Sequence, residues 1–174
     1  MIKILQSYLL SLYHLVISNL TISSHALKTQ CELNAFLIEK GNRYSEIVKY
    51  YEIEFNRAAS QCNNFEATTE ANYILNKENE AIERFHYDNY RNIKKIAEKI
   101  GVNALDDTDN KYTSVFEDEE LGDLKFVNVE GQNIILEAIR NELAGRMRVT
   151  YSLLTLVFSF IAALAASCAA LRSQ

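Results

Sequence analysis

The feature that most constrains the fold is a run of 23 residues, Val149 to Leu171, that contains no charged side chain. At a rise of about 1.5 Å per residue, a helix of this length crosses a hydrocarbon core of about 30 Å. Helices in the core of a soluble domain rarely stay uncharged for so long. We therefore expect residues 149–171 to form a transmembrane helix, with the lipid bilayer as a partner of the chain.

The helical pattern extends upstream of this span. Between about residue 131 and residue 148, large apolar side chains recur at every fourth position, and Gly145 is the one possible breaker. This spacing is typical of one helix face. We predict a juxtamembrane helix over residues 131–148 that continues into the span without a break. Its apolar positions are Ile135, Ile139, Leu143 and Met147.

A second uncharged segment, residues 4–27, lies near the N-terminus and has two interpretations. It resembles a secretory signal, with Lys3 as the positive end, an apolar core and small residues before a cleavage site at Ala26. Its polar side chains nevertheless recur every three or four positions, which is typical of a formed helix with a wide apolar face. We favour a retained helix over residues 1–26 and keep a cleaved signal peptide as the alternative. The polar stripe consists of Lys3, Ser7, Ser11, His14, Ser18 and Thr21.

The composition predicts an all-α fold. The chain has no proline and only five glycines among 174 residues, so few residues mark turns between strands. With an apolar segment near each end, we expect a membrane-anchored helical bundle or coiled coil, in which residues 27–101 form the bundle region.

Three helices are expected in residues 27–101. The first is capped by Ser23 or Ser24 and runs to about Lys40, where Gly41-Asn42 predicts a break because glycine destabilises helix interiors. The second runs from about Tyr44 to Gln61, and the third from Thr68 or Thr69 to Gly101.

The third helix carries a stripe with alternating spacings of three and four, as in a helix that packs lengthwise on partners. Its two polar members, Glu78 and Asn89, are expected to be wet or partly exposed, with a role in fixing register as the alternative. The stripe is Ala71, Ile74, Glu78, Ile82, Phe85, Asn89, Ile93, Ile96 and Ile100.

Residues 102–130 are predicted to be an acidic linker. Up to Asp123 this segment has eight acidic side chains and a single cation, Lys111, so charge repulsion favours an extended, solvated chain. Leu124–Val129 could form a short extended piece. Asp106, Thr108, Asn110 and Glu117 have the spacing of calcium ligands, but Lys111 occupies the position that requires glycine.

No catalytic or metal-binding pattern survives inspection, so we predict no enzyme activity, no metal and no cofactor. Glu83 and His86 have Glu-x-x-His spacing, but a di-iron site needs a second copy that the chain lacks. Cys31, Cys62 and Cys168 form no paired motif. Nucleic acid is also an improbable partner. The segment from residue 28 to residue 148 holds all 23 acidic and 16 of the 18 basic residues, which leaves it with a net charge of −7.

Small residues repeat at every fourth position of the apolar span. Helices in lipid associate by close backbone approach at such faces. We expect this small face to pair with a second copy, with another membrane protein, or with the polar stripe of the N-terminal helix. The candidate packing residues are Ser159, Ala162, Ala163, Ala166, Ser167 and Ala170.

The sequence thus favours a membrane-anchored interaction or assembly protein that self-associates. The alternative is a sensor or ligand-binding domain with a pocket lined by Tyr44, Tyr50, Tyr51 or Tyr73. The excess of arginine before the span, at Arg140, Arg146 and Arg148, favours a cytosolic domain with a tail anchor. An N-terminal signal or first membrane pass favours the non-cytosolic side, which we prefer.

Overall fold

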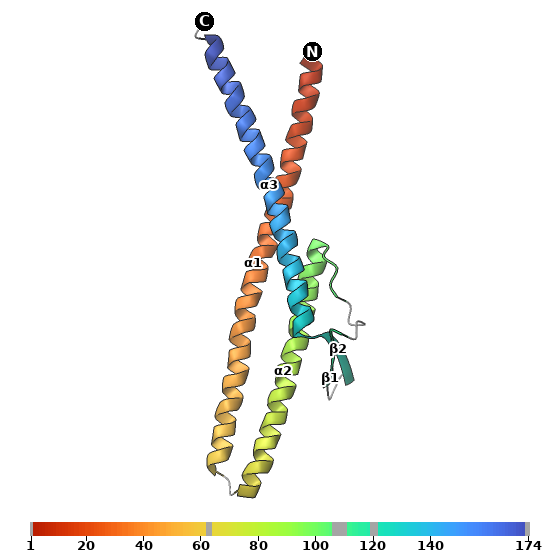
Figure 1. Cartoon of the computed structure of the whole chain (residues 1–174), viewed down its shortest axis with the longest axis vertical. Helices are drawn as coiled ribbons and strands as arrows, with labels where there is room; N and C mark the ends of the chain where they lie inside the picture. The colour runs from red at the N-terminus through yellow and green to blue at the C-terminus, as the bar shows by residue number, and fades with distance from the viewer. Residues whose placement is uncertain (1, 62–63, 106–110, 119–121, 173–174) are drawn as a thin grey trace. The chain divides into compact units, whose positions relative to one another are not determined.

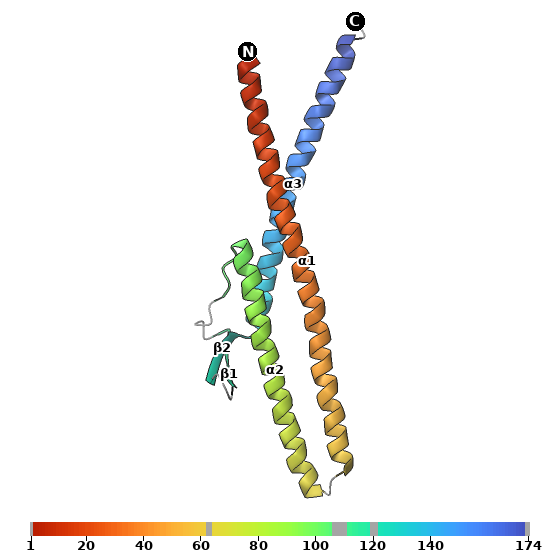
Figure 2. The ribbon, with the colours of Figure 1, turned by 180° about the vertical axis from the view of Figure 1, so that it is seen from behind.

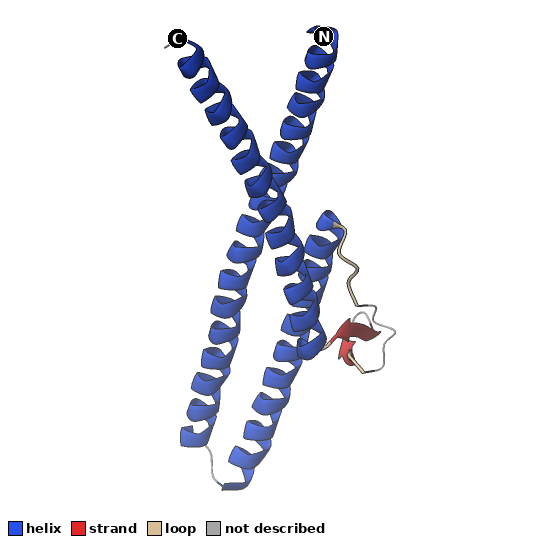
Figure 3. Ribbon diagram, turned by 45° about the horizontal axis from the view of Figure 1, so that its top comes forward, coloured by secondary structure: helices blue, strands red, loops and turns tan. Residues whose placement is uncertain are grey.

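The computed structural model describes residues 2–61, 64–105, 111–118 and 122–172. Inside its helices and strands, the side chains of residues 2–9, 12, 61, 64–68, 118, 164 and 167–172 are not described. The described chain forms helix α1 (Ile2–Gln61), helix α2 (Asn64–Ile100), strands β1 (Thr113–Asp118) and β2 (Gly122–Val127), and helix α3 (Val129–Arg172) (Figure 1). The strands, red in Figure 3, form one hairpin, so the prediction of a predominantly helical chain is confirmed.

The chain divides into two compact units. The terminal unit contains residues 1–31 and 140–174, and the central unit contains residues 32–139. Both α1 and α3 contribute residues to each unit.

Helix α1 continues through Gly41, so the predicted break at Gly41-Asn42 is wrong. Gly41 is exposed, and its φ angle is not positive. A glycine inside a helix costs about 1 kcal/mol relative to alanine, which is less than the contacts on either side of it supply. On its C-terminal side, the Tyr44 ring lies 5.6 Å from the Phe85 ring, and on its N-terminal side Leu33 is fully buried.

The parts of α1 and α2 in the central unit lie side by side and run in opposite directions (Figures 1 and 2). Lys99 Nζ donates to a Glu32 carboxylate oxygen at 2.8 Å, and an Arg43 guanidinium nitrogen donates to Asp88 at 3.3 Å. From Glu32 to Arg43 the chain advances eleven residues along α1, and from Lys99 to Asp88 it goes back eleven residues along α2. The two ion pairs therefore fit one constant antiparallel register. These ion pairs are partly exposed, so they orient the helices more than they stabilise them.

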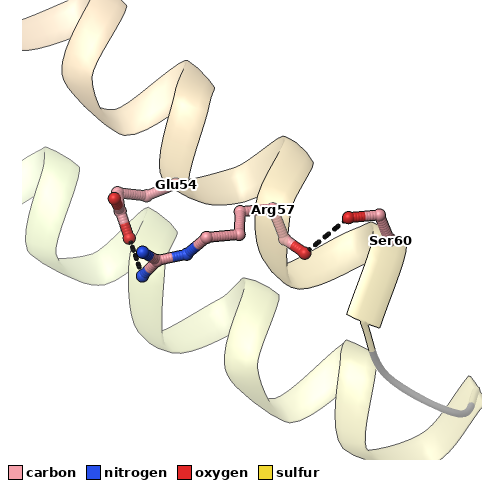
Figure 4. A network of polar contacts seen from close by, with 3 residues as sticks. All are labelled: Glu54, Arg57 and Ser60. Atoms are coloured by element: carbon pink, nitrogen blue, oxygen red, sulfur yellow. Dashed lines mark hydrogen bonds and ion pairs between the residues drawn. The ribbon is translucent and has the colours of Figure 1, made fainter.

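Local side-chain interactions mark the end of α1, as Figure 4 shows. Arg57 forms an ion pair with Glu54, and Ser60 Oγ donates to the Arg57 carbonyl at 2.8 Å. Helix α1 ends at Gln61, and α2 begins at Asn64, earlier than the predicted start at Thr68 or Thr69.

The predicted stripe on α2 faces inward. Its members from Ala71 to Ile82 are partly buried, and those from Phe85 to Ile100 are buried. The expectation that Asn89 is wet or partly exposed is wrong, because its side chain is 4 % exposed. The end at Gly101 is confirmed. With φ at 71°, this glycine donates its N–H to Glu98 at 3.2 Å, and the next N–H bonds Ala97 at 3.0 Å, which is a Schellman cap.

The acidic segment contains a β-hairpin that the sequence did not predict. Its strands pair antiparallel from Thr113 opposite Val127 to Asp118 opposite Gly122. Phe116 and Phe126 are buried on one face. On the other face Val115, Glu117, Asp123 and Lys125 are exposed, and Val127 at its end is fully buried. The solvated-linker prediction is therefore wrong for the two strands, because their alternation buries Phe116 and Phe126 while the charges stay exposed. The short extended piece expected over Leu124–Val129 is confirmed for its part in β2, Leu124 to Val127. Residues 106–110 and 119–121 lie outside the described chain.

Helix α3 begins at a side-chain cap. The Asn128 Oδ1 atom accepts the N–H of Gly131 at 3.0 Å, the standard N-cap arrangement. From Val129 the helix runs 44 residues without a break at Gly145, which confirms the predicted continuity between residues 131–148 and the apolar span.

In the terminal unit, residues 2–31 of α1 and 140–172 of α3 run in opposite chain directions, and both chain ends lie at the same end of this unit (Figures 1 and 2). The two helices are joined where Thr150 Oγ1 donates to the Asn19 carbonyl at 3.3 Å. Ala26, Thr29 and Leu143 are buried residues of this unit.

Candidate interaction site

The burial of α3 changes abruptly at Thr150. Upstream, Ile135, Ile139 and Leu143 are fully or almost fully buried, as the four-residue spacing predicts. Downstream of Thr150, no residue whose side chain is described is buried. Large apolar side chains are exposed there instead, including Leu156 and Phe158, each 66 % exposed.

One helix in the described chain is long and apolar enough to cross a membrane, and it covers Val129–Ala163 of α3. Only 6 % of its most apolar 18-residue stretch is buried inside the protein. The core helix of a soluble protein would be mostly buried inside the protein. The low burial of this helix is instead typical of a helix that contacts lipid or another partner.

Polar side chains in both apolar segments bond to their own helix. Thr155 Oγ1 donates to the Tyr151 carbonyl at 2.9 Å, and Ser159 Oγ donates to the Thr155 carbonyl at 2.8 Å. In α1, Asn19 Nδ2 donates to the Leu15 carbonyl at 2.8 Å, and Thr21 bonds the carbonyl four residues earlier. Each of the three hydroxyls, and one N–H of the Asn19 amide, thereby has a hydrogen-bond acceptor without water, as an apolar environment favours.

The small face of the span is exposed where its side chains are described, at Ser159, Ala162, Ala163 and Ala166. The side chains of Ser167 and Ala170 lie outside the description. In the N-terminal polar stripe, Ser11, His14, Ser18 and Thr21 are exposed as well. The described members of the two faces are therefore not buried against each other, and the pairing of the small face with the polar stripe stays a prediction. The contact between α1 and α3 in this unit uses Asn19 and Thr150 instead. Pairing with a second copy stays a prediction.

A buried polar junction in the central unit escaped sequence reasoning. Gln132 is fully buried, and its Nε2 donates to the Val127 carbonyl at 2.8 Å and to the His86 carbonyl at 3.0 Å. One side chain thus joins α2, β2 and α3. A glutamine near a predicted helix start carries no signal for this role, which requires knowing that the hairpin and α2 meet there.

The same junction contains buried polar atoms without a hydrogen-bond partner among the described residues: His86 Nδ1, Asn89 Nδ2 and Gln132 Oε1. Burial lowers the pKa of His86, and the nearby Lys40 cation lowers it further. The pKa of Lys40 is itself lowered by burial. Because His86 is partly removed from water and lies near the Lys40 cation, its protonated, charged form is disfavoured.

The other candidate residues are not brought together. The described chain contains no group of three or more His, Cys, Asp or Glu side chains that could hold a metal ion, and Glu83 is exposed. The proposed calcium ligands Asp106, Thr108 and Asn110 lie outside the described residues. Cys31 is a free, exposed thiol, and the side chains of Cys62 and Cys168 are not described.

The tyrosines proposed for a ligand pocket are mostly at the surface. Tyr44, Tyr50 and Tyr73 are exposed, and Tyr51 is partly buried beside Tyr50, with ring centroids 5.1 Å apart. A shallow surface groove of about 600 Å³ in the central unit lies along α1 near Ile38 and Arg43, and none of the four tyrosines lines it.

A search of known proteins finds no match among family models, curated proteins or solved structures. The class of the protein therefore follows from the structure: the described chain is mostly helical and has one candidate membrane-spanning helix.

Proposed function

We propose that this chain is a membrane-anchored helical protein that serves interaction or assembly and associates with copies of itself. The observation that carries this proposal is the change along α3, where burial ends at Thr150 while the apolar surface continues. In water, the exposed side chains beyond Thr150 would form an apolar patch that soluble monomers rarely tolerate. In a bilayer, Leu, Ile, Phe and Val each favour insertion by about 0.3–0.6 kcal/mol, and residues 149–171 contain no charge to oppose it.

The N-terminal segment is proposed to remain in the bilayer beside α3. The Asn19–Thr150 hydrogen bond, the exposed apolar side chains Ile17 and Leu20, and the backbone bond of Thr21 support a retained helix over a cleaved signal. With two antiparallel spans, both chain ends would lie on one side of the membrane and the central unit on the other.

The central unit is proposed to lie on the non-cytosolic side. A domain of this size can be translocated, although the arginines before the span favour the opposite side. Self-association is proposed through the small face, because its described side chains are exposed and small residues allow close approach of helices in lipid.

Alkaline extraction followed by protease protection tests the anchoring and its direction. The full chain should stay with the membrane pellet under alkaline conditions, as integral proteins do. In sealed vesicles with the cytosolic face outward, the region from Asp106 to Asp123 should resist added protease until detergent is present. Release into the alkaline supernatant would refute the anchor, whereas cleavage without detergent would reverse the orientation and leave the anchor intact.

A further inference from the structure

An open groove of about 470 Å³ lies between α1 and α3 in the terminal unit. Leu15 contributes from α1, and the rest of the lining comes from α3. Along α3 the groove extends over nine residue steps, about 14 Å of helix. Its apolar lining consists of Leu15, Val149, Leu153, Leu156 and Val157.

A positively charged side chain, that of Arg148, lies at one end of this groove. Arg148 lines it, is exposed, and directly precedes the uncharged span that begins at Val149. No ion pair with Arg148 is found among the described residues. The next basic residue of α3, Arg146, binds Glu142 at 2.8 Å instead. The groove thus offers a positive charge at the edge of the apolar span and an apolar channel leading away from it.

This arrangement matches the chemistry of an anionic phospholipid. A guanidinium binds a phosphate through paired N–H donors, while an acyl chain fits a groove lined by aliphatic side chains. The charge lies at the depth of the headgroups if the span begins at Val149, and the apolar lining then faces the hydrocarbon.

A second copy of the chain fits the groove less well. A parallel copy seated in the groove itself would place its own Arg146 and Arg148 directly beside Arg148, and like charges opposite each other are unfavourable. A contact through the small face begins at Ser159, about 16 Å further along the helix. The small face around Ala162 and Ala166 contributes no residue to this groove, so it stays available for self-association.

We infer that the groove between α1 and α3 binds one anionic phospholipid, with its phosphate on Arg148 and an acyl chain along Leu153 and Val157. This inference rests on the proposed membrane anchoring.

The test uses the full chain in bilayer nanodiscs of phosphatidylcholine mixed with a photoactivatable phosphatidylglycerol, followed by peptide mapping. Crosslinks should concentrate on the segment from Arg148 to Val157 and on the peptide containing Leu15. Arg148→Gln should reduce crosslinking about fivefold, the contribution expected of one arginine near an anionic surface. Arg140→Gln, an exposed arginine on the same helix outside the groove, is the matched control and should change it little.

A second variant, Val157→Phe, keeps the charge but narrows the groove, and it should also reduce crosslinking at these positions. Equal losses for Arg148→Gln and Arg140→Gln would show generic attraction to the surface and refute the site. Crosslinks on the small face, or protein–protein crosslinks through the groove, would refute it as well. Recovery of the chain in assembled nanodiscs is scored first, so failed insertion would count against the proposed anchoring, whereas insertion without selective labelling would count only against the lipid site.

Discussion

Replacing Gly131 by alanine should destabilise the protein, although the position lies in a helix. A Cβ atom there would lie 2.3 Å from Val127 Cγ1 and 3.0 Å from the Tyr112 Cβ, whereas ordinary carbon contacts are about 3.5–4.0 Å. Val127 cannot yield easily because it is fully buried, β-branched and bonded through its carbonyl to Gln132. Overpacking of this kind costs about 1–3 kcal/mol.

Gly41→Ala is the matched reference. At Gly41 an added Cβ meets nothing within 4 Å, and the φ angle is not positive. Alanine should therefore gain the helix-propensity difference of about 1 kcal/mol in the free energy of unfolding. The two variants change the same group, so their opposite signs isolate the local contacts from the propensity.

The measurement is thermal unfolding of the full chain in one detergent, followed by far-ultraviolet circular dichroism. For a chain of this length, 1 kcal/mol shifts Tm by about 2–4 °C, so Gly131→Ala should lower Tm by about 2–12 °C and Gly41→Ala should raise it by about 2–4 °C. A Gly131→Ala protein as stable as the wild type would refute the close approach of the hairpin to α3. Loss of stability in Gly41→Ala would show that α1 breaks there.

Three further outcomes are expected. Burial and a neighbouring lysine lower the pKa of His86 below 6.5, so the unfolded state binds more protons than the folded state as the pH falls through 6.5. The free energy of unfolding should therefore decrease from pH 7.5 to 5.5. His86→Gln should flatten this decrease in unfolding experiments. Asp106→Asn with Asp109→Asn should change the free energy of unfolding by less than about 0.5 kcal/mol, and calcium-dependent stabilisation lost in this variant would contradict the prediction. Ala166→Leu should reduce dimer crosslinking in bilayers more than Leu156→Ala, since each lost packing contact costs about 1 kcal/mol and lipid solvates leucine as well as a helix does; the reverse order would assign pairing to another face.

Periodicity predicted the helices because it reports burial directly. The stripe from Ala71 to Ile100 is buried or partly buried at every position, and the end at Gly101 follows from a cap that needs a positive φ angle. Gly41 misled because a single unfavourable residue was weighed without its context. Its cost of about 1 kcal/mol is local, whereas the contacts that hold α1 straight come from α2, far away in the sequence.

The hairpin and the polar junction depend on contacts that are distant in the chain. Eight carboxylates obscured the alternation that places Phe116 and Phe126 on one face, because net charge and periodicity made opposite predictions there. Charges on the exposed face of a hairpin remain hydrated, so they do not oppose burial of the other face. Gln132 then becomes a buried bridge only because β2 and α2 both present carbonyls to it.

The polar residues in the two apolar segments illustrate how structure changes the meaning of composition. In the sequence alone, the hydroxyls of Thr155 and Ser159 weaken the case for a membrane span, because an unpaired polar group in hydrocarbon costs several kcal/mol. In the structure each hydroxyl donates to the carbonyl one turn earlier, so that cost is largely removed. Thr150 bonds both its own helix and the Asn19 carbonyl of α1, at the residue where burial of α3 ends. The residues that look least suited to a bilayer are therefore hydrogen-bonded to the helix backbone, and Thr150 links the two proposed spans.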